Sequence, residues 1–327
     1  MVGRWPAAGQ SAPTVGGITL DRTRHFLEGL GLPSRDAYDL PTSPKRFPDG
    51  AQYRVEIPSV EGPRAYAAVN AAAEEYGVTV QRISQGSGIM LLTDDEIREM
   101  GQIGREHGQE VSLFVGPRAA FDVGAQATST AGRLIGPRLR GADQLVYAIE
   151  DVRRACELGI RGVLVTDDGL LYILGEMRKA GELPADLVIK ISVAMGSANP
   201  ASARLLETLG AGTLNIPTDL TLPQIAAIRQ AISIPLDIYV ESPDDYGGFV
   251  RYFEIAEIVR VAAPVYVKFG LRNAPNIYPS GTHLEATAVT LSRERVRRAR
   301  IGVDTLRRYY PDAQTSAIGA ADLAIPR

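Results

Sequence analysis

Short apolar segments with a period of two recur along this chain, and each is followed by a segment with helical periodicity. A strand followed by a helix, repeated eight times, is the order of a (β/α)8 barrel. We therefore predict a single barrel of the TIM type. The eight predicted strands are YRVEIPS (53–59), VQRIS (80–84), EVSLFVG (110–116), GVLVTD (162–167), LVIKISVAM (187–195), TLNIPTD (213–219), PLDIYVE (235–241) and PVYVKFG (264–270).

The alternation within these strands separates two faces. In a barrel one parity of each strand packs on the outer helices, and the other parity points into the barrel. An interior built only for stability contains branched apolar residues, and an ionised group out of water costs several kcal/mol unless it is paired. The many charges expected inside therefore indicate a functional site. The inward positions are Arg54, Glu56, Arg82, Ser84, Ser112, Thr166, Lys190, Ser192, Asn215, Asp237, Tyr239, Glu241, Tyr266 and Lys268.

The helical patterns set the domain organisation. Residues 53–310 supply about the 250 residues that one barrel needs, so we expect no second domain. Residues 1–52 form an N-terminal extension with a Pro-rich connector, and residues 311–327 form a tail. Within the extension, 20–34 is amphipathic and is expected to cover either the barrel bottom or a partner subunit in a homo-oligomer. Helices are predicted at 62–77, 93–108, 142–159, 170–181, 199–210, 221–233, 249–262 and 291–310.

Composition excludes several classes of protein. The net charge of −3 offers no basic field for nucleic acid. No apolar run approaches the roughly 20 residues of a membrane span, and the N-terminus lacks a secretory signal pattern, so a cytoplasmic location is the default. Cys156 is the one cysteine, so we expect neither disulfides nor an iron–sulfur cluster.

Three βα connections exceed the usual 2–6 residues, namely 117–141, 242–248 and 271–290. All three leave the C-terminal ends of strands, the face where TIM-barrel enzymes place their chemistry. Arg118 and Arg272 in these loops are candidates for two-point contacts with an anion, or are ordinary surface arginines. His283 could titrate near neutrality or bind a metal, or could be an exposed loop residue without a role.

Lys190 and Lys268 are the sharpest catalytic candidates. A lysine with apolar walls or near another cation has a lowered pKa and can form a Schiff base, whereas an inward lysine can also simply bind a carboxylate or phosphate. The alternative is a structural ion pair with Glu56, Asp237 or Glu241. These three carboxylates could in turn act as general acids and bases or bind Mg²⁺ or Mn²⁺, so whether a metal is needed stays unknown. Arg82, Ser84, Asn215 and Tyr239 are predicted to contact the substrate.

The stretch TLNIPTDLTLPQIAAIRQAISIPLDIYVESPDDYGG (213–248) resembles the collagenase-like peptidases of the unclassified, U32-like family. In that family a strand, an LTLPQI-type helix start and an LDIYVE-like strand follow one another. The resemblance implies a TIM barrel and, in some members, an iron–sulfur cluster held by cysteines. Those cysteines are absent from this chain, and no Ser-His-Asp, Cys-His or HExxH arrangement supports a peptidase.

We therefore interpret the chain as a TIM-barrel enzyme for a small, anionic, oxygen-rich substrate. A lyase, aldolase or isomerase that uses inward lysines and carboxylates fits the pattern best. A hydrolase or peptidase-like relative is the first alternative, and a non-catalytic barrel subunit of an assembly is the second.

Overall fold

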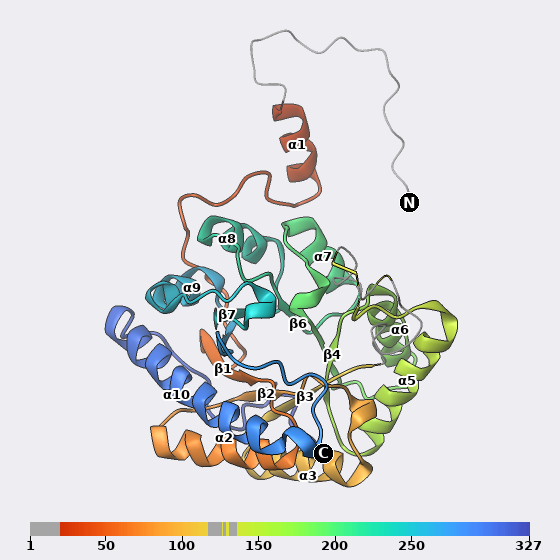
Figure 1. Cartoon of the computed structure of the whole chain (residues 1–327). Coiled ribbons are helices and arrows are strands. Elements are labelled where there is room, and N and C mark those ends of the chain that lie inside the picture. Colours follow the sequence, from red (N-terminus) through yellow and green to blue (C-terminus); the bar gives the residue numbers. More distant parts are fainter. Residues whose placement is uncertain (1–19, 117–125, 127–128, 131–135) are drawn as a thin grey trace.

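The computed structural model describes residues 20–116, 126, 129–130 and 136–327. Its eight strands are parallel and pair in chain order, and β8 pairs with β1 to close the barrel. The helices form a ring around the strands (Figure 1). This is the (β/α)8 barrel that the alternation of the sequence predicts.

The strands are shorter than the period-two pattern suggested. They are β1 Tyr53–Pro58, β2 Arg82–Ser84, β3 Glu110–Phe114, β4 Gly162–Val165, β5 Val188–Ile191, β6 Thr213–Asn215, β7 Leu236–Glu241 and β8 Val265–Phe269. The largest difference follows β5, where the strand was expected to continue to residue 195. Instead Ser192 accepts a hydrogen bond from the Ala194 N–H and starts the 3-10 turn η4, Val193–Met195. Ser192, Val193 and Ala194 line the barrel mouth.

The outer helices are α2 Pro63–Tyr76, α3 Asp94–Glu106, α5 Gly141–Glu157, α6 Asp168–Lys179, α7 Pro200–Thr208, α8 Leu222–Ala231, α9 Ile255–Ala262 and α10 Glu285–Tyr309. The capping box expected at the start of α3 is present, since Thr93 and Glu96 bond each other's backbone N–H. Two boundaries differ from the prediction. α9 begins at Ile255 because the chain first forms the 3-10 turn η6, Tyr252–Glu254, and α10 begins six residues early at Glu285.

The apolar parity of the strands packs against the helices as expected and forms the main hydrophobic core. Burial of these side chains provides the main stabilisation of the fold. The opposite parity is then left for the barrel interior, where the polar side chains lie. The strand residues of the core include Val55, Ile57, Ile83, Val111, Leu113, Val163, Val165, Ile189, Ile191, Leu214, Leu236, Ile238, Val265, Val267 and Phe269.

The chain segments before β1 and after α10 close the N-terminal end of the barrel. Phe47 packs edge-on against Tyr266 with ring centroids 5.4 Å apart. In the C-terminal segment, Asp322 binds the Arg54 guanidinium at 2.6 Å. The helix α1, Asp21–Gly29, buries no residue and projects beyond the ring of helices (Figure 1). It does not cover the barrel bottom, and contact with a partner subunit, the other alternative, stays a prediction. None of the described helices is long and apolar enough to cross a membrane.

Two helical glycines test how closely the outer layer packs. A Cβ on Gly302 of α10 would lie 2.5 Å from Phe269 Cζ, whereas a Cβ on Gly101 of α3 would meet nothing nearer than 3.6 Å. We expect Gly302→Ala to lower the free energy of unfolding by about 1–3 kcal/mol through overpacking. Gly101→Ala should raise it by up to about 1 kcal/mol, because alanine favours helix. Urea denaturation measures both. A Gly302→Ala protein of parental stability would show that the Phe269 ring can move away.

Candidate functional site

Arg82 of β2 lies at the centre of a charge network that fills the barrel. Its side chain is fully buried and donates to Glu56 of β1, with 2.6 Å between Nη2 and Oε2, and to Asp237 of β7. Nη1 lies 3.3 Å from Glu110 of β3. The Tyr266 ring of β8 stacks on the guanidinium, with Cζ 3.4 Å from the ring centroid. One cation therefore binds groups from four strands and raises the cost of opening the barrel.

Lys190 of β5 is fully buried beside this arginine. Its ammonium bonds Glu56 Oε1 and lies 3.5 Å from Asp237 Oδ2. Burial, followed by the charge of Arg82, lowers the pKa of Lys190 to about 7, and Asp237 and Glu56 offset only part of that shift. Lys190 is therefore close to half-protonated at neutral pH.

Glu56 is the carboxylate that these cations share. Oε1 accepts from Lys190 and from Ser84 Oγ at 2.7 Å, and it lies 3.3 Å from Lys268 Nζ. Burial alone would raise the pKa of Glu56, but Arg82, Lys190 and Lys268 together hold it well below its usual value. Glu56 thus stays ionised and links the buried network to Lys268.

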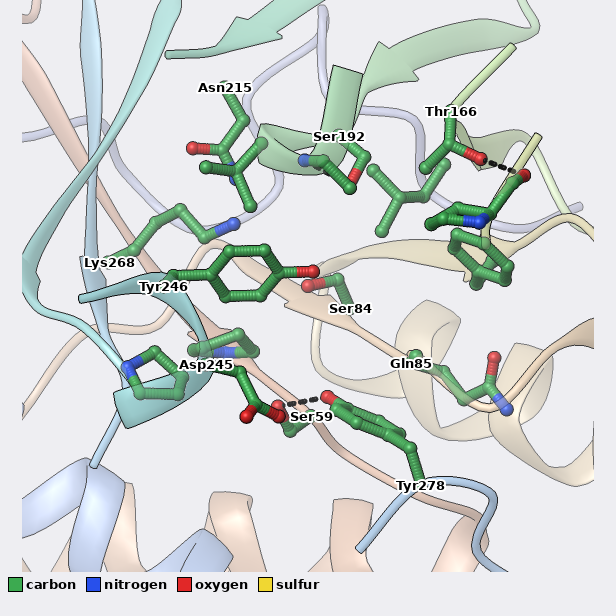
Figure 2. Close-up of a pocket in the computed structure, with 18 of the residues that line it drawn as sticks. Ser59, Ser84, Gln85, Thr166, Ser192, Asn215, Asp245, Tyr246, Lys268 and Tyr278 are labelled. Carbon is green, nitrogen blue, oxygen red and sulfur yellow. Dashed lines mark hydrogen bonds between the residues drawn. The ribbon is translucent and has the colours of Figure 1, made fainter. Parts of the chain in front are cut away.

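A cavity of about 280 Å³ opens at the C-terminal ends of the strands, above this network (Figure 2). Lys268 of β8 lies at its edge with only 2% of its surface exposed. With the Asn215 amide oriented so that its oxygen faces the lysine, Lys268 Nζ donates to it at 2.7 Å. The ammonium also lies 4.3 Å from the centroid of the Tyr239 ring. Among the described residues that line the cavity, Lys268 is the one cation and Asp245 the one carboxylate.

Hydroxyl groups make up much of the remaining polar lining. Tyr278 donates a hydrogen bond to Ser59 Oγ at one side of the cavity (Figure 2). Burial raises the pKa of Tyr278, and burial followed by the charge of Glu56 raises that of Tyr239, so both phenols are uncharged. Asp245 and Tyr246 come from the 3-10 turn η5, Asp244–Tyr246, after β7. The other hydroxyl-bearing residues of the lining are Ser84, Thr166 and Ser192.

The structure separates the predicted site residues into groups. Lys268, Ser84, Asn215 and Tyr239 line the cavity together. A second group lies beneath them as the buried network and contributes nothing to the lining. Arg82, predicted to contact the substrate, belongs to that second group, and its contacts are with carboxylates and a ring of the protein itself. The second group is Glu56, Arg82, Lys190 and Asp237.

Glu241 was expected in the same cavity, and this was wrong. A β-bulge shifts the register of β7 against β8, so that Tyr239 pairs with Lys268 but Glu241 pairs with Phe269. The extra residue reverses the parity and turns the Glu241 carboxylate to the helix side. There it accepts from Tyr252 Oη at 2.6 Å and from Arg298 Nη1 of α10 at 3.2 Å. Arg54 also lies apart, at the N-terminal end with Ser316 and Asp322.

The predicted clamp over the mouth is not formed by the described loop residues. Arg272 is exposed over 61% of its side chain, and its Nε lies 3.9 Å from Asp244. His283 lies exposed in the 3-10 turn η7, Thr282–Leu284, and like Arg272 is not among the described lining residues. Arg118 lies outside the described residues. The long loops do reach the site, but through Asp245, Tyr246 and Tyr278, which were not among the predicted site residues.

The suggested Mg²⁺ or Mn²⁺ ligands do not form a metal site. Glu241 is on the other side of the strand from Glu56 and Asp237, which already bind Arg82 and Lys190. Within the part of the chain that the structure describes, no group of three or more His, Cys, Asp or Glu is placed to hold a metal ion.

Comparison with known proteins bears on the fold and on one segment. Peptidase family U32 matches residues 139–242, which confirms the resemblance in the part of 213–248 that overlaps. A putative fructose-1,6-biphosphate aldolase from Coccidioides immitis has a similar fold, with 13% identity and a TM-score of 0.50 over 79% of this chain and 92% of its own. The U32 peptidase Mk0906 is 17% identical, with a TM-score of 0.39 over 61% of this chain and 73% of its own. The likeness to the aldolase, at 13% identity, shows the fold alone. No curated protein matches the chain.

Glu56 provides a test of the buried network. Glu56→Ala leaves buried cations without their shared carboxylate, so we expect the free energy of unfolding to fall by about 3–5 kcal/mol. Glu75→Ala is the matched control, because Glu75 forms an exposed pair with Arg293 and should cost less than about 1 kcal/mol. Urea denaturation measures both. A Glu56→Ala protein as stable as the parent would mean that the network contributes nothing.

Lys190 makes stability depend on pH. Its pKa is about 7 in the folded protein and near 10.5 in the unfolded chain, so between these values the unfolded chain holds a proton that the folded protein lacks. The free energy of unfolding should therefore gain a component that rises with pH from about 7 towards about 10. Lys190→Met should remove that component. Lys179→Met changes an exposed lysine of α6 and should keep the parental slope. Equal slopes in the parent and Lys190→Met would contradict the lowered pKa.

Proposed function

We propose that this chain is a lyase or isomerase for a small hydroxylated carbonyl compound, with Lys268 as the group that polarises the carbonyl oxygen. The observation that carries the proposal is the position of the Lys268 ammonium, held by Glu56 and Asn215 at the edge of the cavity. The cavity lies at the barrel face where TIM-barrel enzymes carry out their chemistry.

The surroundings of Lys268 favour an electrophile over a nucleophile. A carboxylate oxygen, an amide oxygen and the face of the Tyr239 ring all interact favourably with an ammonium. An ammonium has no lone pair with which to form a Schiff base, but it donates hydrogen bonds to an oxygen that gains negative charge. Such fixed donors stabilise an enolate in a site shielded from water. We therefore assign Lys268 the binding of the carbonyl oxygen.

Asp245 is the proposed base. It is the carboxylate of the described lining, and it lies on the turn that follows β7. In the proposed step Asp245 takes the proton from the carbon next to the carbonyl, and the electron pair moves onto the oxygen held by Lys268. In an isomerase the proton of the adjacent hydroxyl then moves to that oxygen, and Asp245 returns its proton to the former carbonyl carbon. In a lyase Asp245 instead takes the proton of the hydroxyl one carbon further from the carbonyl, and the C–C bond between them breaks as that hydroxyl becomes a carbonyl. The electron pair of the broken bond forms the enolate whose oxygen Lys268 holds. Ser84, Thr166 and Ser192 offer hydrogen bonds to substrate hydroxyls.

The alternatives have less support. A hydrolase of the serine or cysteine type needs a nucleophile paired with a base, and none of the described cavity residues is a histidine or cysteine. A non-catalytic barrel would be expected to have a filled mouth, whereas this cavity of about 280 Å³ is open. Its volume suits a substrate below drug size.

Deuterium exchange tests the proposal directly. The protein is incubated in D₂O with a panel of small hydroxyaldehydes, hydroxyketones and 2-oxo acids, and loss of the C–H signal next to the carbonyl is followed by proton NMR. We expect exchange for at least one compound, and a loss of at least about 100-fold in rate for Lys268→Met and for Asp245→Asn. Lys179→Met should exchange at the parental rate.

Borohydride distinguishes the two roles of Lys268. We expect no reduced adduct on the protein after treatment with an active compound, because the ammonium does not attack the carbonyl. A stable adduct on Lys268, found by mass spectrometry, would assign it a Schiff-base role instead. Absence of exchange across the whole panel would contradict the proposed reaction class.

A further inference from the structure

Arg295 of α10 is a buried cation without a counter-ion. Its exposed fraction is 4%, Nη1 donates to the Ser59 carbonyl at 3.1 Å, and Nε has no partner. Among the described residues no carboxylate oxygen lies within 4 Å of its guanidinium. The carboxylate of Glu61 contributes to its electrostatic environment, but that group accepts from the N–H groups of Gly86 and Ser87 instead.

The other buried arginines among the described residues have more partners within the protein than Arg295 does. Arg54 binds Asp322, and Arg82 binds Glu56 and Asp237. The Nε of Arg229 also has no partner, but both of its terminal nitrogens donate hydrogen bonds, to the carbonyls of Ile234 and Ile232. A buried charge that lacks such partners is costly, and burial lowers the pKa of Arg295 accordingly. A cost of this kind is maintained where function needs the group.

Arg295 also differs in that it lines a cavity. A space of about 70 Å³ lies between its side chain, the loop after β8 and the turn η5. Ser59, Asp245, Asn276 and Tyr278 line both this space and the main cavity, so the two are adjacent. Tyr278 and Ser59, which line both spaces, are joined by a hydrogen bond, and Figure 2 shows this bond. We call the smaller space the annex.

We infer that the annex binds a carboxylate group, with Arg295 as the residue that holds it. The guanidinium offers a planar pair of donors that matches a carboxylate. The annex is small, about 70 Å³, and a carboxylate is a small, planar oxyanion with two acceptor oxygens. This inference rests on the proposed function in one respect: the carboxylate belongs to the carbonyl substrate of the main cavity. The preferred substrate is then a small oxo or hydroxyoxo acid.

Asp245 opposes such a ligand, since its carboxylate lines the annex as well. It is exposed at the rim, and the solvent there screens its charge. Asp244, the other acid of the annex, accepts a hydrogen bond from the Asn273 N–H and lies near Arg272. The guanidinium is the deeper and less screened charge, so the balance favours an anion.

Binding of acetate to the full chain tests the inference without any activity. Affinity is measured by saturation-transfer NMR for the parent, Arg295→Gln and Arg293→Gln. We expect Arg295→Gln to weaken acetate binding at least about tenfold, because a hydrogen bond between charged groups is lost. Its melting temperature should match or exceed that of the parent, since an unpaired buried charge is removed. Arg293→Gln alters an exposed arginine of the same helix and should bind acetate as the parent does.

Three further measurements distinguish binding in the annex from binding in the main cavity. Asp245→Asn should tighten acetate binding about two- to fivefold, because it removes a nearby like charge. Inorganic phosphate should bind more weakly than acetate to the parent. Lys268→Met should retain acetate binding in the annex even where it abolishes exchange chemistry, so a failed reaction class leaves this test intact.

The contrary results are equally definite. Acetate binding that survives in Arg295→Gln, or that is lost in Lys268→Met while Arg295→Gln retains it, would place the anion in the main cavity and overturn the inference. Absence of acetate binding to the parent would overturn it too. A marked fall in the melting temperature of Arg295→Gln would assign the guanidinium a structural role through Ser59.

Discussion

The pairing of buried charge around Arg82 is the constraint on which the interior of this barrel depends. Three basic side chains, Arg82, Lys190 and Lys268, meet three carboxylates, Glu56, Glu110 and Asp237, and all six are buried. Ionised groups persist in such a place only when their partners are fixed. The strands must therefore keep their relative positions, and the network holds Glu56 where it can position Lys268 at the edge of the cavity.

The shared carboxylate also links the protonation state of Lys190 to the contacts of Lys268. Lys190 and Lys268 both contact Glu56 Oε1, and Lys190 has a pKa of about 7. When Lys190 loses its proton, the Glu56 carboxylate has one cation fewer beside it. Its negative charge then interacts more strongly with the Lys268 ammonium. A pH dependence of the proposed chemistry could therefore originate in a lysine that never meets the substrate.

Local periodicity predicted the fold and much of the interior, because strand parity decides which side chains face inward. It succeeded for Glu56, Lys190, Asp237 and Lys268, which lie in regular strands. It failed at Glu241, where one extra residue in β7 reverses the parity and no local signal announces it. Parity also does not predict how deep an inward side chain lies in the barrel. Lys268 reaches the cavity, whereas Lys190 lies below it.

The loop residues show a different limit. Arg272 and His283 were chosen for their chemistry and their place after β8, but the path of a loop depends on tertiary contacts such as those of Asp244 with Asn273 and Arg272. Arg295 was not predicted as a site residue, because it lies in a helix with many charged residues, where an arginine is expected to be exposed. The packing of α10 in the structure is what shows that Arg295 is buried. A buried guanidinium that has an unpartnered Nε and borders an open space is best explained by a partner that arrives from solution.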